Sequence, residues 1–386
     1  ISRRICSPQP VPNYGTASFK LSVKKWEFDM GWMWIRLFSL LGLAEVRRTA
    51  PIAHKIRGKQ TLDMDTAMAI LNNRFQIMAQ YRKHVIKPLV VGRNPLDIGA
   101  LWQAMWGQHR HVTLRAIGAV DVALWDLAGK VAGLPVHRLL GTCKLEVPAY
   151  ASSSYLPTPQ AYGEEAARYK SLGWTAYKTH PHGIPANDIE ICRAIRRSVG
   201  DDMVLMLDAM WAYTYKESVR VGRAIEELNY FWYEDPLAEG DIYNYVKLHE
   251  KLDIPIMSTE YAPGRFYGMT PWITQYATDI LRGDVAVTGG ITPMVKLCHL
   301  AEGFNMKCEI HHGGNSLNNV ANLHVMMAVP NCEFYEFFPC TGANEYGLVE
   351  DIEFDDQGRV HAPTGPGLGY QIDWDLVKRE HTATVE

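Results

Sequence analysis

The sequence predicts an α/β fold in which a barrel of parallel strands is surrounded by helices. From Glu146 onward, short apolar runs alternate with helical stretches, which is the pattern of repeated β-α units and a parallel sheet. Eight such units within about 190 residues favour a barrel with a modified last helix. An open doubly wound sheet is the alternative, but no G-x-G-x-x-G follows the first run.

The individual elements follow from apolar periodicity and from residues that start or stop helices. Before the barrel, residues 15–60 suggest strands, and helices are expected over 62–85, 96–108, 114–132 and 136–140. The eight expected strands are 147–152, 176–180, 203–208, 230–234, 254–260, 280–287, 306–312 and 334–338. The helices expected between them are 160–172, 189–199, 216–228, 242–251, 292–302 and 317–328.

Composition argues against several classes of function. The chain has 386 residues, and Lys+Arg 39 against Asp+Glu 42 is too balanced for a protein that binds nucleic acid or an anionic membrane. An aromatic content of 11% supplies apolar area to bury, which argues against disorder. The 7 cysteines show no C-x-x-C spacing, so reduced thiols in a cytoplasmic protein are expected. The expected partner is a small molecule.

The apolar run 30–44 follows two lysines and has about the length of a signal-peptide core. Arg36 interrupts the run, which is also shorter than the roughly 20 residues that a membrane span needs. We interpret its first part as a strand with Trp32 and Trp34 on one face, and a signal peptide is the minor alternative.

Ionisable residues recur once in each β-α unit. Seven of them lie within successive apolar runs or at their C-terminal ends: Lys178, Asp208, Glu234, Glu260, Asp284, His312 and Glu336. Their separations are 30, 26, 26, 24, 28 and 24 residues. Because the C-terminal ends of barrel strands converge on one face, we expect these side chains to share a pocket. Strand termination alone explains one polar residue but not seven ionisable ones in register.

Asp208, Glu234 and Glu260 are the candidate metal ligands. Three facing carboxylates would repel one another and raise one another's pKa unless a cation lay between them. Hard oxygen ligands suit Mg²⁺, so one Mg²⁺ per subunit is expected. Three unrelated surface carboxylates are the alternative, and the apolar surroundings LMLDAMW, FWYEDPL and MSTEYAP argue against it.

Lys178 and His312 lie on opposite sides of these ligands in strand order and are candidate acid–base residues. A cation-rich pocket would lower the pKa of Lys178 and make it a base near neutral pH. His312 is expected to pair with Asp284 on the preceding strand, with His311 as the competitor, because alternation points only one of the two histidines inward. We favour His312, since Gly313-Gly314 lets the chain turn directly after it.

His180 and Glu336 are further candidates for the catalytic site. His180 shares a strand face with Lys178 and is a second acid or base, a substrate hydrogen-bond donor or a solvated strand end. His182 is expected in a loop. Glu336 is either a general acid or a buried structural carboxylate.

A set of motifs together resembles the enolase superfamily, in its mandelate racemase-like group. The motifs are AVDVALWDLAGKVAGLPVHRLLG (119–141), YKTH (177–180), LMLDAMW (205–211), YEDP (233–236), STE (258–260), GDVAVTGGIT (283–292), IHHGGNS (310–316) and PTGPGLGYQID (363–373). They span about two thirds of the chain in the family's order. The second strand has K-x-H where many relatives have K-x-K, the third has D-A-M in place of the frequent D-x-N, and the hairpin over 34–50 lacks the usual glycine-rich loop.

The resemblance implies an α+β capping domain formed by the N-terminal part (1–142) and the C-terminal tail (341–386), over a modified (β/α) barrel of the TIM type (143–340). It also implies Mg²⁺ on the three carboxylates and removal of the proton α to a substrate carboxylate, through an enolate that the metal stabilises. Lys178 and the expected His312–Asp284 dyad would be the bases on opposite faces of the substrate. A homo-oligomer is implied as well.

These expectations favour dehydration of an acid sugar, an aldonate or an aldarate, to a 2-keto-3-deoxy acid. A racemase, epimerase or cycloisomerase would use the same residues and would differ in the fate of the hydroxyl group. A zinc hydrolase built on His180, His182, His311 and His312 is disfavoured, because the first strand region carries no H-x-H. A non-catalytic metal-binding barrel is the last alternative, and the presence of every expected ligand and base argues against it.

Overall fold

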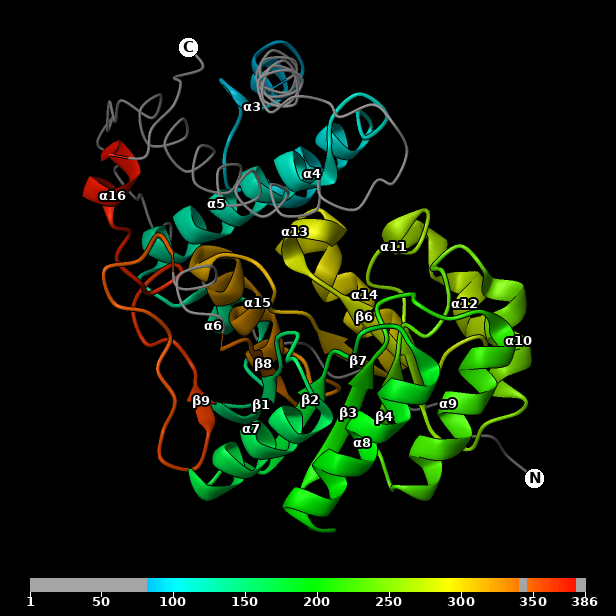
Figure 1. Ribbon diagram of the computed structural model, residues 1–386. Helices are drawn as coiled ribbons and strands as arrows, with labels where there is room; N and C mark the ends of the chain where they lie inside the picture. Colours follow the sequence, from blue (N-terminus) through cyan, green and yellow to red (C-terminus); the bar gives the residue numbers. More distant parts are fainter. Residues whose placement is uncertain (1–81, 340–345, 380–386) are drawn as a thin grey trace, which may run out of the picture.

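Eight parallel strands form the centre of the molecule (Figure 1). The structure is a computed structural model that describes residues 82–339 and 346–379. The strands are β1 (Glu146–Ser152), β2 (Ala176–Thr179), β3 (Val204–Asp208), β4 (Trp232–Glu234), β5 (Ile256–Ser258), β6 (Ile280–Gly283), β7 (Lys307–Ile310) and β8 (Tyr335–Phe337). Their order is β7-β6-β5-β4-β3-β2-β1-β8, with parallel ladders between neighbours. The expected barrel is therefore confirmed.

The seam between β7 and β8 is held by a side chain. Glu309 of β7 accepts hydrogen bonds from the backbone N–H of Glu333 at 2.8 Å and of Phe334 at 3.2 Å, just before β8 begins. A buried carboxylate that accepts backbone donors in this way supplies the acceptors that a strand ladder would otherwise provide. The barrel is thus nearly closed.

Helices lie on the outside of the strands (Figure 1), six of them close to the expected positions and three short ones that were not expected. They are α7 (Pro159–Ser171), α8 (Pro185–Val199), α9 (Tyr215–Glu227), α10 (Ile242–His249), α11 (Arg265–Gly268), α12 (Thr270–Thr274), α13 (Val285–Thr288), α14 (Ile291–Gly303) and α15 (Ser316–Ala328). The expected strand 280–287 is wrong beyond Gly283. Asp284 caps α13 there, because its carboxylate accepts hydrogen bonds from the N–H groups of Ala286 and Val287.

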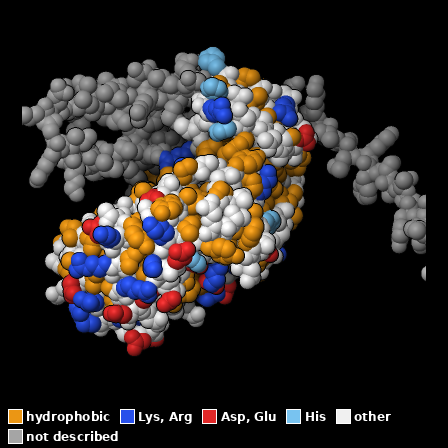
Figure 2. Space-filling model, turned by 90° about the vertical axis from the view of Figure 1, so that its right-hand side faces the viewer, with side chains coloured by type: hydrophobic (Ala, Val, Ile, Leu, Met, Phe, Trp, Pro, Cys, Tyr) orange, Lys and Arg blue, Asp and Glu red, His pale blue; other side chains and the backbone are white. Residues whose placement is uncertain are grey.

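Charged side chains of both signs are interspersed over the face of the molecule that Figure 2 shows. This arrangement agrees with the near-zero net charge of the sequence. Among the described residues, no helix combines the length and the apolarity that crossing a bilayer requires.

The segment before the barrel lies beside α13 at the mouth of the barrel (Figure 1). It contains the π-helix η2 (Arg82–Ile86) and the helices α3 (Lys87–Val90), α4 (Ile98–Trp106), α5 (Leu114–Ala132) and α6 (Val136–Leu140). The bounds expected for α5 and α6 are confirmed. Asp121 of α5 accepts hydrogen bonds from the backbone N–H of Thr292 at 2.8 Å and from its hydroxyl at 2.6 Å, which ties this segment to α14. The expected strands over 15–60, the run 30–44 and most of the helix expected over 62–85 lie outside the described residues.

The C-terminal segment contacts both the first strand of the barrel and the helix α5. β9 (Arg359–His361) pairs antiparallel with the first residues of β1. Further along, the N–H of Leu368 donates to Asp126 of α5 at 2.9 Å, and α16 (Trp374–Arg379) follows. These contacts connect the tail with α5, as expected, while the domain boundaries 1–142, 143–340 and 341–386 remain a prediction.

Side-chain alternation places an apolar layer inside the barrel and polar groups above it. The layer consists of Tyr150, Ala176, Met206, Trp232, Met257 and Ile280. Two residues further along their strands, on the same face, stand ionisable side chains such as Lys178, Asp208 and Glu234. The apolar layer therefore lies directly below the charged side chains at the C-terminal ends of the strands.

Gly129 offers a test of how closely the C-terminal segment packs on α5. A Cβ at Gly129 would lie 2.6 Å from the Cα of Gly367, closer than two non-bonded carbon atoms approach without a shift of the backbone. Gly129→Ala should therefore lower the thermal unfolding midpoint, at a cost of about 1–3 kcal/mol, although alanine normally stabilises a helix. Gly99→Ala in α4 is the control, since a Cβ there meets nothing within 4 Å. Equal midpoints for the two variants in circular dichroism would contradict this packing.

Candidate active site

Three carboxylates stand side by side at the ends of adjacent strands. Asp208 ends β3 and lies opposite Glu234, which ends β4, while Glu260 follows β5 by two residues. All three side chains are buried. Burial raises the pKa of Glu260, and the charges of Glu234 and Asp208 add to that rise. The structure thus brings the three candidate ligands into one another's electrostatic field.

Strained backbone aims Glu260 into the site. Met257 points into the barrel, so simple alternation would turn Glu260 outward. Thr259 has a φ of 96°, which reverses this direction, and its hydroxyl donates to the carbonyl of Arg282 and accepts from its N–H, both at 3.0 Å. Met210, Trp211 and Asp235, which follow β3 and β4, also have positive φ values of 48°, 60° and 42°. Such strain in non-glycine residues concentrates at functional sites.

A buried ionic network joins one of these carboxylates, Glu234, to three other charged side chains. Lys178 Nζ is 2.9 Å from Glu234 Oε2 and 2.8 Å from Glu336 Oε1. Arg282 Nη2 is 2.6 Å from Glu336 Oε2, and Arg282 Nε is 2.9 Å from Glu234 Oε1. All four side chains are buried, so two cations neutralise two anions in a region that water does not reach.

The network corrects the expectation for Lys178. Burial by itself would lower the pKa of Lys178, but the charges of Glu234 and Glu336 raise it well above its ordinary value. A raised pKa thus stands where a lowered one was expected, because the two carboxylates in contact with Lys178 outweigh both burial and the nearby Arg282. Its fully buried ammonium group orients the two glutamates. Glu336 also accepts a hydrogen bond from Ser152 at 2.9 Å, which favours its interpretation as a structural carboxylate.

The donor set fits a hard divalent cation. In the ranges that the structure describes, no three His, Cys, Asp or Glu side chains are arranged closely enough to hold a metal ion as they lie. Glu234 pairs there with Lys178 and Arg282, and Asp208 pairs with His180. Glu234 Oε1 is buried and lies 2.9 Å from Arg282 Nε, but in a geometry that makes no hydrogen bond. Three adjoining carboxylates with such an oxygen match the ligands that Mg²⁺ prefers.

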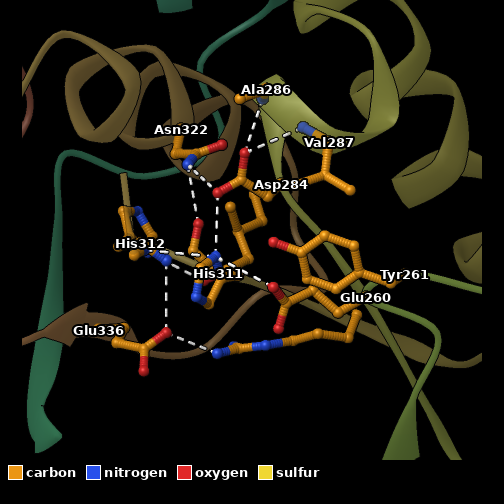
Figure 3. Close-up of polar contacts among 12 residues, drawn as sticks. Glu260, Tyr261, Asp284, Ala286, Val287, His311, His312, Asn322 and Glu336 are labelled. Atoms are coloured by element: carbon orange, nitrogen blue, oxygen red, sulfur yellow. Dashed lines mark hydrogen bonds and ion pairs between the residues drawn. The ribbon is translucent and has the colours of Figure 1, made fainter. Parts of the chain in front are cut away.

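His311, and not His312, contacts Asp284 (Figure 3). The distance from His311 Nδ1 to Asp284 Oδ2 is 3.0 Å, and that to Glu260 Oε1 is 3.5 Å. His312 instead donates through Nδ1 to the carbonyl of Ile310 at 2.8 Å and packs against Tyr335. Burial lowers the pKa of His312 to about 3, so its ring is neutral. The expected His312–Asp284 pair is wrong because β7 ends at Ile310, so strand alternation does not extend to either histidine.

Asp284 is held as an anion that orients His311. Its Oδ1 accepts from the N–H of Ala286 at 2.6 Å, and Asn318 of α15 donates to both of its oxygens at 3.2 and 3.1 Å. Burial would raise the pKa of Asp284, but His311 and these donors lower it. For His311, burial opposes the positive charge, and Glu260 with Asp284 outweighs it and raises the pKa to about 9. Because the carboxylate can only accept, Nδ1 carries the proton and Nε2 is left for the site.

His180 lies at the opposite end of the carboxylate row. Its Nδ1 donates to the carbonyl of Ser153 at 2.7 Å, and its Nε2 is 3.0 Å from Asp208 Oδ2. The backbone carbonyl fixes the ring and leaves Nε2 as the nitrogen that faces the site. His182 follows β2 outside any helix or strand, as expected, and its ring stacks on Tyr155.

Three residues of the site were not identified from the sequence. Arg282 lies on β6, two residues before Asp284. An arginine inside an apolar run could have indicated a buried charged residue at the site. Asp235 follows Glu234 and accepts from the Ser258 hydroxyl at 2.8 Å. Tyr261 follows Glu260 after the strand has ended, so no periodicity could place it. Burial and the charge of Glu260 raise the pKa of Tyr261 to about 12.

Two family models match the chain. The model described as enolase C-terminal domain-like matches residues 161–376, which is more than half of the sequence. The model of the mandelate racemase / muconate lactonizing enzyme N-terminal domain matches residues 66–141. The chain belongs to the enolase superfamily, in its mandelate racemase-like group. The resemblance inferred from the motifs is therefore confirmed.

Similar proteins include two dehydratases and a cycloisomerase. Arabinonate dehydratase of Saccharolobus solfataricus is 30% identical over 299 residues, which cover 75% of this chain and 79% of the relative. A crystal structure of D-glucarate dehydratase from Agrobacterium tumefaciens, complexed with magnesium, is 34% identical with a TM-score of 0.73, covering 78% of this chain and 83% of that chain. The 3,6-anhydro-D-galactonate cycloisomerase from Zobellia galactanivorans is 29% identical with a TM-score of 0.72, covering 78% and 87%.

Arg282 tests the role of the buried network in stability. Arg282→Met would leave Glu234 and Glu336 with one buried cation in place of two, and should destabilise the fold by about 3–5 kcal/mol. Arg193→Met is the control, since Arg193 pairs with Glu190 on the exposed face of α8, and exposed pairs contribute little. Urea unfolding followed by circular dichroism measures both. Similar midpoints for the two variants would show that the network is not needed for stability.

Proposed function

We propose that the protein is a Mg²⁺-dependent hydro-lyase that removes water from an acid sugar, an aldonate or an aldarate, and forms a 2-keto-3-deoxy acid. The observation that carries this proposal is the placement of two oriented histidines at the two ends of the carboxylate row. His180 lies beside Asp208, and His311 lies beside Glu260. Dehydration requires one group that takes a proton and another that gives one to the departing hydroxyl.

The metal site of this proposal uses the three adjoining carboxylates. Mg²⁺ bound by Asp208, Glu234 and Glu260 would stabilise the negative charge that develops on the substrate carboxylate as the α proton leaves. Lys178 and Arg282 hold Glu234 from below, so its carboxylate keeps one orientation. The magnesium in the D-glucarate dehydratase structure supports this assignment.

The proton-transfer steps belong to the two histidines. One of them takes the proton from C2, the C2–C3 double bond forms, and the C3–O bond breaks as the other histidine protonates the departing hydroxyl to water. The resulting enol becomes the 2-keto product. Asp284 accepts a hydrogen bond from Nδ1–H of His311 and so stabilises the imidazolium form of this histidine. Ser153 fixes His180 through its carbonyl in the corresponding way. Lys178, expected as a base, is assigned here to positioning.

An isomerase is the second candidate function. The likeness to 3,6-anhydro-D-galactonate cycloisomerase favours it. The same histidines would then move a proton at one carbon without loss of the hydroxyl as water. Every expected ligand and base is present in the sequence, which argues against a barrel without catalytic activity. From the composition and the resemblance we also propose that the enzyme is a homo-oligomer of the cytoplasm.

The decisive experiment is proton NMR in D₂O with Mg²⁺ and a panel that contains D-arabinonate, D-xylonate and D-glucarate. We expect the signals of one substrate to be replaced by those of a 2-keto-3-deoxy product, and EDTA to stop the reaction. Asp208→Asn should abolish turnover and weaken Mg²⁺ binding in calorimetry, while the exposed Glu164→Gln should change neither.

Exchange of the α proton without loss of water would replace the dehydratase by a racemase or epimerase. Full turnover in EDTA would refute the metal site. No reaction with any acid sugar would refute the proposed function.

The two adjacent histidines should differ sharply in their effect on activity. His311→Asn removes the imidazole that Asp284 orients and should lower kcat at least 100-fold, as loss of a general acid or base does. His312→Asn keeps an N–H donor for the Ile310 carbonyl and should retain kcat within about tenfold. Steady-state kinetics on the substrate found by NMR measures both, with circular dichroism to verify folding. The reverse ranking would make His312 the catalytic histidine.

A further inference from the structure

Tyr261 lies on the His311 side of the site and is not used by the mechanism above. Figure 3 shows its ring between Glu260 and Asp284, with the hydroxyl directed toward the Asp284–His311 pair. The hydroxyl is hydrogen-bonded to neither of them. Among the described residues its one hydrogen-bond partner is Arg115, whose Nη2 donates to it at 3.1 Å.

The ring of Tyr261 is held from several directions. Arg115 reaches it from the first turn of α5, and the guanidinium of Arg265 lies 5.3 Å from the centre of its ring. Trp211 meets the ring edge to face, with the centroids 5.7 Å apart. The backbone N–H of Tyr261 donates to Glu239. A tyrosine fixed in this way loses little further conformational freedom when it binds a ligand.

The hydrogen bond from Arg115 determines what the hydroxyl can do. A guanidinium is always a donor, so the phenolic oxygen accepts and its own proton remains available for another acceptor. Acid sugars carry hydroxyl oxygens along the carbon chain and carboxylate oxygens at one or both ends, and these are the acceptors that such a donor would bind.

We propose that Tyr261 is a substrate-binding residue whose hydroxyl donates a hydrogen bond to an oxygen of the acid sugar on the His311 side of the site, with Arg115 as its positioning residue. This inference rests on the proposed function and extends it to recognition of the substrate. A site with a fixed donor discriminates against an analogue that lacks the matching oxygen, because the donor is then left unpaired. Tyr261 therefore contributes to the choice among acid sugars.

The test compares Tyr261→Phe with the wild-type enzyme on the substrate found by NMR. Loss of one hydrogen bond made to bound substrate should raise KM about tenfold and leave kcat within about threefold. Tyr276→Phe is the control, because Tyr276 is 73% exposed, and it should behave as wild type. Deoxy analogues of the substrate identify the contacted oxygen: one of them should lose about tenfold in kcat/KM with the wild type and lose little further with Tyr261→Phe.

Arg115 supplies a second, independent variant. Arg115→Ala should raise KM as Tyr261→Phe does, and the double variant should be no worse than either single variant, because both changes remove the same contact. Arg115→Lys keeps a donor and should restore part of the loss. If Tyr261→Phe fails to fold, as judged by circular dichroism, Arg115→Ala with its lysine rescue carries the test.

The outcomes separate this inference from the proposed function. A wild-type enzyme that turns over no acid sugar overturns both. A wild-type enzyme that does so, with an unchanged KM in Tyr261→Phe and the same deoxy penalties, overturns the role of Tyr261 alone. Additive effects of Tyr261→Phe and Arg115→Ala overturn the positioning role of Arg115.

Discussion

The buried ion pairs of Lys178 and Arg282 with Glu234 and Glu336 are the interaction on which the rest of the site depends. Moving a carboxylate out of water is costly unless a cation and hydrogen-bond donors accompany it. Both cations come from barrel strands, β2 and β6, and both glutamates from β4 and β8. The network therefore joins strands from different sides of the barrel just above its apolar layer. Without Lys178 and Arg282, the buried negative charges of Glu234 and Glu336 would not be neutralised.

The residues that follow the strands give the site above this network two different sides, one at His311 and one at His180. Positive φ at Thr259 directs Glu260 inward, and the short helix α13 begins where Asp284 caps it. Asp284 is thereby fixed where it contacts His311, and this contact orients the histidine. At the other end, the carbonyl of Ser153 holds His180 beside Asp208. These contacts are local, but they occupy Nδ1 of both histidines and so leave Nε2 of each toward a substrate.

The helix α5, which precedes the barrel, also contacts residues around the site. Asp121 of α5 holds the start of α14 through Thr292, close to the turn at Gly290. Burial raises the pKa of Asp121 to about 7, although Thr292 opposes the rise. Arg115, on the same helix, reaches Tyr261 at the mouth of the barrel. The helix α5 therefore contacts both the start of α14 and a side chain beside the carboxylates.

The sequence by itself determined the barrel and the meeting of Asp208 and Glu234 at neighbouring strand ends, whereas the inward direction of Glu260 depends on the positive φ of Thr259, which no strand pattern indicates. It could do so because apolar periodicity and the spacing of one ionisable residue per unit are properties of regular strands, whose C-terminal ends must converge. The tertiary structure alone decided between His311 and His312, ended the sixth strand at Gly283 and placed Lys178 among carboxylates. The first two depend on backbone directions beyond the last strand hydrogen bond, where alternation no longer applies. The pKa of Lys178 depends on Glu234 and Glu336, which reach it across the barrel from distant parts of the chain.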